Sequence, residues 1–137
     1  MNLSFTFNLC ALSILPSIAH ALYPRTTAAN PTQGLTWGSG NTATLEFCET
    51  SSGFAYRLPG ETDCMPKKPG PLIVLSPGTT YTLVLKNLSS KSTNIHTHGL
   101  HQVGDGDGDN IFREALPGEC LQYTWAIPSS HSGGTHW

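Results

Sequence analysis

The sequence predicts an all-β protein, a Greek-key β-sandwich, from three observations. Its 14 Gly and 10 Pro are spread along the 137 residues, as expected for a chain with many turns. Several segments between these turns alternate apolar and polar residues with a period of two. No segment after residue 21 has a helical period. Short strands separated by turns are typical of sandwich folds.

Composition excludes one class of partner. The chain is long enough for one domain with a hydrophobic core. Charged residues make up 12% of it, and the net charge is −2. This balance provides no basic surface of the kind that binds nucleic acid. We therefore expect no nucleic-acid partner.

Residues 1–21 are expected to be a secretory signal peptide. An apolar run ends in Ala19-His20-Ala21, which matches an A-x-A cleavage site, although the run is preceded by no Lys or Arg. Asn8 and Pro16 interrupt the run, so it is a poor candidate for the ~20 apolar residues of a membrane helix. We expect a secreted, extracellular chain that begins near Leu22 and has no membrane partner after cleavage.

Three cysteines follow the expected cleavage site: Cys48, Cys64 and Cys120. In an oxidising compartment Cys48 and Cys64 could close a disulfide around the loop between them. Two other pairings are possible, the sequence does not decide among them, and each leaves one thiol over. Asn87-Leu88-Ser89 is an N-glycosylation sequon, which is consistent with a secreted glycoprotein and a surface turn at this position.

Residues 22–69 are assigned to an N-terminal arm and the first strands of the domain. The arm, residues 23–33, is rich in Thr, Ala and Pro. Residues 42–47 alternate only roughly and are expected to form a strand. Residues 54–58 are expected to form a short strand within a Gly- and Pro-rich loop.

Residues 70–137 carry a clearer strand pattern. The apolar run 71–75 ends at the turn signal Ser76-Pro77-Gly78, and residues 79–85 then alternate cleanly. Further strands are expected at the histidine-rich segment and, after a turn at 117–119, at residues 121–127. Residues 135–137 resemble the first residues of a strand. We therefore expect a sandwich that is C-terminally incomplete.

The chain is organised around the segment Asn94-Ile95-His96-Thr97-His98-Gly99-Leu100-His101. Side chains alternate faces along a strand, so His96 and His98 should project from the same side. His is the commonest ligand for zinc and copper, and a neutral imidazole suits both metals. The simplest alternative is an exposed pair of histidines at the end of a strand.

Two other metals fit the sequence less well. His96-x-His98-x-x-His101 nearly matches the H-x-H-x-D-H pattern of metallo-β-lactamase-like zinc hydrolases, but Leu100 stands where the pattern requires Asp. Residues 105–110 place three Asp as in an EF-hand calcium loop. That loop would require Gly at Asn110 and Glu at Leu116, so a solvated acidic turn is the better interpretation.

Four segments together indicate copper. They are residues 76–82, a turn and a strand; residues 94–100, an H-x-H-G motif; residues 117–125, a turn and an aromatic strand; and residues 133–137, Gly-Gly-Thr-His-Trp. In this order they resemble segments of the multicopper oxidases, the laccase-like family built from cupredoxin (plastocyanin-like) domains. The last segment resembles the lead-in to the family's second motif, W-Y-H-x-H.

The resemblance implies a cupredoxin-like sandwich with copper as the cofactor. His96 would ligate the type 2 copper and His98 one copper of the type 3 pair. Asp109 would stand where the family often has an acidic residue that donates protons during oxygen reduction, although it could instead cap the turn. His101 lies three residues past His98 and would be on the opposite face of a continuing strand, so we expect it to support the site or face solvent. The resemblance gives His136 no ligand role.

The same resemblance implies that this chain holds only part of such an enzyme. The family's oxygen-reducing centre uses several H-x-H pairs from the first and last domains, together with a type 1 copper site. This sequence has one pair and no type 1 site. We expect the N-terminal part of a secreted oxidase that, at full length, oxidises phenols, amines or metal ions and reduces O2 to water. Alone, the chain would be inactive; the alternative is a secreted, non-catalytic copper-binding β-domain.

Overall fold

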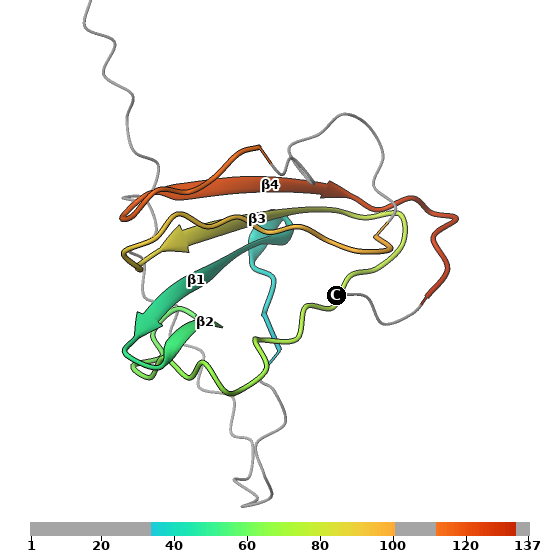
Figure 1. Ribbon diagram of the computed structural model, residues 1–137. Coiled ribbons are helices and arrows are strands. Elements are labelled where there is room, and N and C mark those ends of the chain that lie inside the picture. The colour runs from blue at the N-terminus through green and yellow to red at the C-terminus, as the bar shows by residue number, and fades with distance from the viewer. Residues whose placement is uncertain (1–33, 101–111, 134–137) are drawn as a thin grey trace, which may run out of the picture.

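The computed structural model describes residues 34–100 and 112–133, and a single four-stranded sheet forms its centre (Figure 1). A short 3-10 helix, η2 (Ser39–Asn41), precedes the sheet. The strands are β1 (Thr42–Thr50), β2 (Gly53–Arg57), β3 (Thr80–Asn87) and β4 (Cys120–Ala126), in the order β2-β1-β3-β4. β1 and β3 are parallel, and the two outer pairs are antiparallel. The predicted all-β class is confirmed.

One face of the sheet carries the hydrophobic core. On β3 the alternating residues Tyr81, Leu83 and Leu85 are buried, as the sequence predicts. Their partners across the antiparallel pair are Trp125, Tyr123 and Leu121 of β4, and these are buried as well. The two side chains of each cross-strand pair therefore shield one another from water. This burial of apolar surface is the main source of stability in such a sheet.

Segments outside the sheet cover this core face. The side chains of Trp37, Ile73, Leu75 and Ile95 pack against the buried cluster. Ile73 and Leu75 point inward, while Leu72 and Val74 are more than half exposed. The apolar run 71–75 therefore alternates in burial, but the strand expected for it is absent from the described structure. Leu72 makes an isolated bridge with Gly34, and no ladder follows it in the described part of the chain.

Both predicted Pro-Gly turns are present. Gly78 and Gly118 have φ angles of 75° and 81°, a left-handed conformation that favours glycine. The backbone N–H of Gly118 donates to the carbonyl of Asn87, and that of Gly78 donates to the carbonyl of Ile127. These bonds connect the turns to the strands beside them and set where β3 and β4 begin and end.

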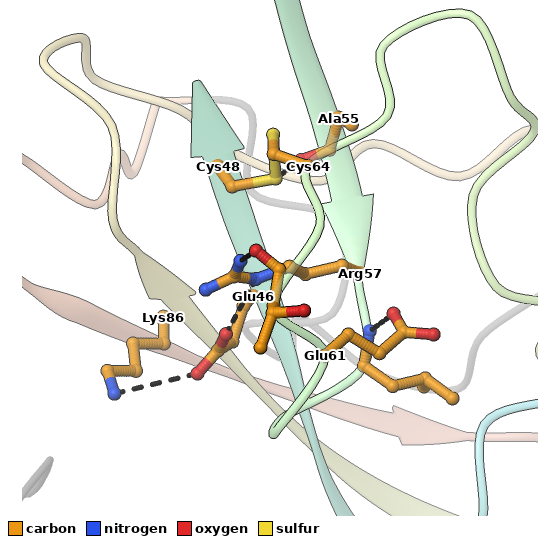
Figure 2. Close-up of polar contacts among 9 residues, drawn as sticks. Glu46, Cys48, Ala55, Arg57, Glu61, Cys64 and Lys86 are labelled. Carbon is orange, nitrogen blue, oxygen red and sulfur yellow. Dashed lines mark hydrogen bonds and ion pairs between the residues drawn. A yellow bond between two sulfur atoms is a disulfide. The ribbon is translucent and has the colours of Figure 1, made fainter. Parts of the chain in front are cut away.

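The opposite face of β1 carries an ion network (Figure 2). Glu46 lies across from Arg57 of β2 and Lys86 of β3 in the strand register. Its carboxylate is 3.0 Å from Arg57 Nε and 3.6 Å from Lys86 Nζ. Arg57 Nη1 also donates to the carbonyl of Thr62 at 3.1 Å. Glu46 is only 7% exposed, so the two cations neutralise a charge that burial alone would disfavour.

A disulfide lies on the same face, two residues further along β1. Cys48 is bonded to Cys64, and the two Cα atoms are 5.9 Å apart. This is one of the three pairings that the sequence left open. Cys120 is also disulfide-bonded, so none of the described cysteines is the leftover thiol that we expected. The Cys48–Cys64 bond and the Arg57–Thr62 contact together hold the loop after β2 against β1.

Asn87 ends β3 on the core face and is fully buried, at 0% exposure. Its Nδ2 group donates to the carbonyls of Lys91, at 2.6 Å, and Ala115, at 2.8 Å. Its Oδ1 atom accepts from the backbone N–H and the hydroxyl of Ser89. The amide that would carry a glycan is therefore inside the protein and donates both of its hydrogens. The turn that follows Asn87 does lie at the surface, where Leu88, Ser90 and Lys91 are exposed.

The expected signal peptide and N-terminal arm fall outside the described residues, as do the acidic segment 105–110 and residues 135–137. Among residues 34–100 and 112–133, no helix is long and apolar enough to cross a membrane.

Removing the Cys48–Cys64 disulfide should lower the free energy of unfolding by about 3 kcal/mol, because the closed loop is of a length for which chain entropy gives that value. The sequence separation of the two cysteines is 16 residues. The measurement is equilibrium urea unfolding of a Cys48→Ala/Cys64→Ala double variant, followed by tryptophan fluorescence. Equal unfolding free energies of variant and wild type would contradict a stabilising role for this bond.

Replacing Asn87 by Ala should destabilise the protein by about 3 kcal/mol, because the carbonyl groups of Lys91 and Ala115 would lose a buried donor. Asn87→Asp is the sharper variant. It keeps an acceptor for Ser89 but places the second carboxylate oxygen against those two carbonyls. Urea unfolding measures both effects. An Asn87→Asp protein as stable as wild type would show that the network does not hold the turn.

Candidate metal centre

The segment that carries the histidine pair follows β3 through the turn that Asn87 organises. After this turn, Thr93 and Ala115 exchange two backbone hydrogen bonds, of 3.1 and 2.8 Å, in an isolated antiparallel bridge. Residues 94–100, which the sequence predicts as a strand, contain a bend at 98–99 and join no ladder in the described structure. The predicted histidine strand is therefore wrong, although the segment is anchored immediately before it reaches the histidines.

His96 and His98 lie side by side. Their ring centroids are 4.9 Å apart, and the ring planes meet at 72°, an edge-to-face arrangement. Both side chains are exposed. The spacing in sequence therefore does bring the two imidazoles together, and neither is buried in the core. An exposed pair of imidazoles can accept a metal ion without first breaking core packing.

The pair by itself is an incomplete metal site. Within residues 34–100 and 112–133 there is no cluster of three or more His, Cys, Asp or Glu side chains that could hold an ion. Cu(II) prefers about four ligands in tetragonal geometry. The two imidazoles are suitable nitrogen donors for copper, so the chemistry of the site fits this metal. The remaining ligands would have to come from elsewhere.

Two tyrosine hydroxyls contact the backbone immediately before His96. Tyr56, on β2, donates from its hydroxyl to the carbonyl of Asn94 at 3.1 Å. Tyr123, on β4, accepts a hydrogen bond at its hydroxyl from the N–H of Ile95 at 2.7 Å. From the sequence pattern we expect Tyr123 only to be a core residue. Its place in an alternating strand explains its burial but gives no indication of what its hydroxyl binds.

The pKa of Tyr123 is raised above its ordinary value of 10.0. Burial is the main cause, because it disfavours the phenolate, and the nearby Tyr56 adds to the effect. The hydrogen bond from Ile95 and the positive charge of Arg113 act in the opposite direction but are weaker. The Tyr123 hydroxyl is therefore neutral through the whole physiological pH range.

The other residues singled out from the sequence are not brought to the pair. Asp109, proposed as a proton donor, lies outside the described residues, and so do His101 and His136. His131 follows β4, and its Nδ1 atom is 2.7 Å from the carbonyl of Ser132. The zinc pattern and the calcium loop both depend on residues outside the described ranges.

The raised pKa of Tyr123 predicts a loss of stability in alkaline solution. Below pH 10.0 the residue is protonated in both the folded and the unfolded protein, so its contribution is fully present. Above that pH the unfolded chain ionises first, and stability falls as the pH rises through the folded pKa. Urea unfolding from about pH 8 to about pH 11 should therefore show a steeper decline for wild type than for Tyr123→Phe. Parallel curves for the two proteins would contradict the shift.

A family model for multicopper oxidases matches residues 65–137. Laccase-2 of Thanatephorus cucumeris is 33% identical over an alignment of 76 residues, and the match covers 50% of this chain and 13% of that protein. Mouse hephaestin is 38% identical over 65 residues, 47% of this chain and 5% of that protein. Human ceruloplasmin is 30% identical over 66 residues. The chain thus spans only a small part of the relatives it matches.

Solved structures that resemble this chain are also multicopper oxidases, and the chain again covers only part of each. A multicopper oxidase from Campylobacter jejuni, described as a metallo-oxidase, superposes with a TM-score of 0.58 at 26% identity; the match covers 84% of this chain and 25% of that one. A laccase-like multicopper oxidase from Ochrobactrum sp. has a TM-score of 0.50 at 21% identity, a likeness of fold alone, over 72% of this chain and 22% of that one. The cupredoxin-like fold expected from the sequence is confirmed. Because the family model covers more than half of its residues, this chain belongs to the multicopper oxidase family.

Proposed function

We propose that this chain supplies one copper-binding part of a secreted multicopper oxidase, with His96 and His98 as its metal ligands. The observation that carries the proposal is the contact between the two exposed imidazoles, 4.9 Å between ring centroids, in the part of the chain that the family model matches. Copper is the metal of this family. By resemblance, His96 serves the type 2 copper and His98 the type 3 pair.

The proposal gives a separate role to each of the few residues that it names. The two imidazoles bind copper through ring nitrogens. The bridge between Thr93 and Ala115 anchors the segment that presents them. When bound, copper would supply the electron transfer. Asp109 is the proposed proton donor, on the resemblance alone.

The further ligands and the reaction belong to the longer protein. The chain covers 13% of the laccase that it matches, and its described residues provide two ligands rather than a full set. We propose that the complete enzyme oxidises phenols, amines or metal ions and reduces O2 to water. The candidate signal peptide at residues 1–21 supports secretion. A glycan at Asn87 forms no part of the proposal, since that side chain is buried.

Copper titration of the 137-residue chain tests the metal site. We expect one Cu(II) to bind with a Kd on the order of micromolar or weaker, and His96→Ala and His98→Ala each to weaken binding by at least about tenfold. Nitrogen hyperfine structure in the electron paramagnetic resonance spectrum should decrease with each substitution. His131→Ala is the matched control, and its affinity should equal that of wild type.

Two results would contradict the proposal. Equal affinities of wild type, His96→Ala and His98→Ala would exclude this pair as the ligands. Tight one-to-one binding, far below micromolar, would favour the alternative of a self-sufficient copper-binding domain. Sequencing the transcript on both sides of this segment separates these roles further, because an oxidase requires a reading frame with additional H-x-H pairs.

A further inference from the structure

The two tyrosine hydroxyls that contact the backbone before His96 bind the same peptide group. The carbonyl of Asn94 and the N–H of Ile95 are the two polar ends of one peptide bond. Tyr56 donates to the first at 3.1 Å, and Tyr123 accepts from the second at 2.7 Å. A peptide group is planar, so fixing both of its ends fixes the orientation of the whole plane.

The two hydroxyls come from opposite edges of the sheet. Tyr56 belongs to β2 and Tyr123 to β4, the two outer strands in the order β2-β1-β3-β4. The segment they hold thus lies across the core face, and the side chain of Ile95 packs against the core there. The electrostatic effect of Tyr56 on Tyr123 is consistent with hydroxyls that converge on one point.

The segment needs such contacts because it has left the sheet. After the bridge between Thr93 and Ala115, residues 94–97 join no ladder in the described structure. Backbone groups near a core must still find hydrogen-bond partners, and here tyrosine side chains replace a neighbouring strand. Only the φ and ψ angles of Ile95 separate the held peptide plane from the next plane, which carries His96. Ile95 is β-branched and half-buried, which restricts those two angles further.

We propose that Tyr56 and Tyr123 are positioning residues for the histidine pair. By clamping the Asn94–Ile95 peptide, they set the direction in which His96 and His98 leave the backbone. The inference rests on the proposed function only for its consequence, copper affinity; the positioning itself can be measured in the metal-free protein.

The two hydroxyls differ in importance. Without the Tyr123 hydroxyl, the Ile95 N–H would lose its acceptor next to a residue that is 1% exposed. Without the Tyr56 hydroxyl, the Asn94 carbonyl would lose one donor at a half-buried position. Orphaned N–H groups are rarer and costlier than under-satisfied carbonyls. Tyr123→Phe should therefore displace the histidines more than Tyr56→Phe.

Tyr81 provides a matched control. Its side chain lies on the same core face, and its hydroxyl accepts from a backbone N–H, that of Ser76, at 2.9 Å. That N–H belongs to the turn before β3 and not to the histidine segment. Tyr81→Phe therefore removes the same kind of hydrogen bond, while the Asn94–Ile95 peptide keeps both partners.

The experiment compares Tyr123→Phe, Tyr56→Phe and Tyr81→Phe in the 137-residue chain. In the metal-free proteins, NMR should show a weakened nuclear Overhauser effect between the His96 and His98 rings for Tyr123→Phe, and no change for Tyr81→Phe. Hydrogen exchange of the Ile95 amide should accelerate in the same variant. With Cu(II), the affinity of Tyr123→Phe should fall by about tenfold, the low end of what loss of a supporting hydrogen bond costs a metal site, and that of Tyr56→Phe by less.

Unchanged contacts between the His96 and His98 rings in both Tyr123→Phe and Tyr56→Phe would contradict the proposed positioning role of the two tyrosines. An equal loss of these contacts in Tyr81→Phe would contradict it as well. If Tyr123→Phe does not fold, Tyr56→Phe alone decides, since its half-buried position makes it the milder change. If the ring contacts weaken as expected but copper binding does not depend on His96, the positioning role of the tyrosines is supported and the proposed metal site is contradicted.

Discussion

Burial of one face of β3 is the constraint on which the rest of the described structure depends. This strand pairs on both sides, parallel to β1 and antiparallel to β4, and Leu83 and Leu85 are completely buried. The next position on the same face is Asn87, so the alternation places a polar side chain where water cannot reach it. A buried amide must satisfy its hydrogen bonds within the protein, and the turn after β3 supplies them. The path of the chain toward the histidines is therefore set by the last residue of this strand.

The sequence predicts the strands whose two faces differ clearly. β3 and β4 alternate strictly and are flanked by Pro-Gly turns, so both were expected close to their observed bounds. In β1 the adjacent Leu45 and Glu46 are both buried, one in the core and the other in the ion network, and this obscures the period. Residues 71–75 show the reverse case, because they alternate in burial without forming a ladder. Alternating burial shows which side of a segment faces the core, but it does not show that a neighbouring strand is present.

The same distinction separates what was predictable at the site from what was not. The i, i+2 spacing of His96 and His98 sufficed to place the rings together, since any extended backbone does so. The hydroxyl partners of Tyr56 and Tyr123 depend on how the segment crosses the core, which no local pattern encodes. Asn87 was misinterpreted for the same reason, because a three-residue sequon contains no information about burial. The disulfide pairing required the register of β1 and the path of the loop after β2.

A segment held by individual side chains responds to substitution differently from a strand held by a ladder. In a ladder each hydrogen bond is supported by its neighbours, whereas the Asn94–Ile95 peptide depends on two hydroxyls that act separately. The Glu46 ion network and the Cys48–Cys64 disulfide lie on the other face of the sheet and contribute to stability from there. Changes on that face can therefore alter the free energy of unfolding without moving the imidazoles. The hydroxyls of Tyr56 and Tyr123 on the core face cannot be changed in this way, because they hold the backbone from which the histidines project.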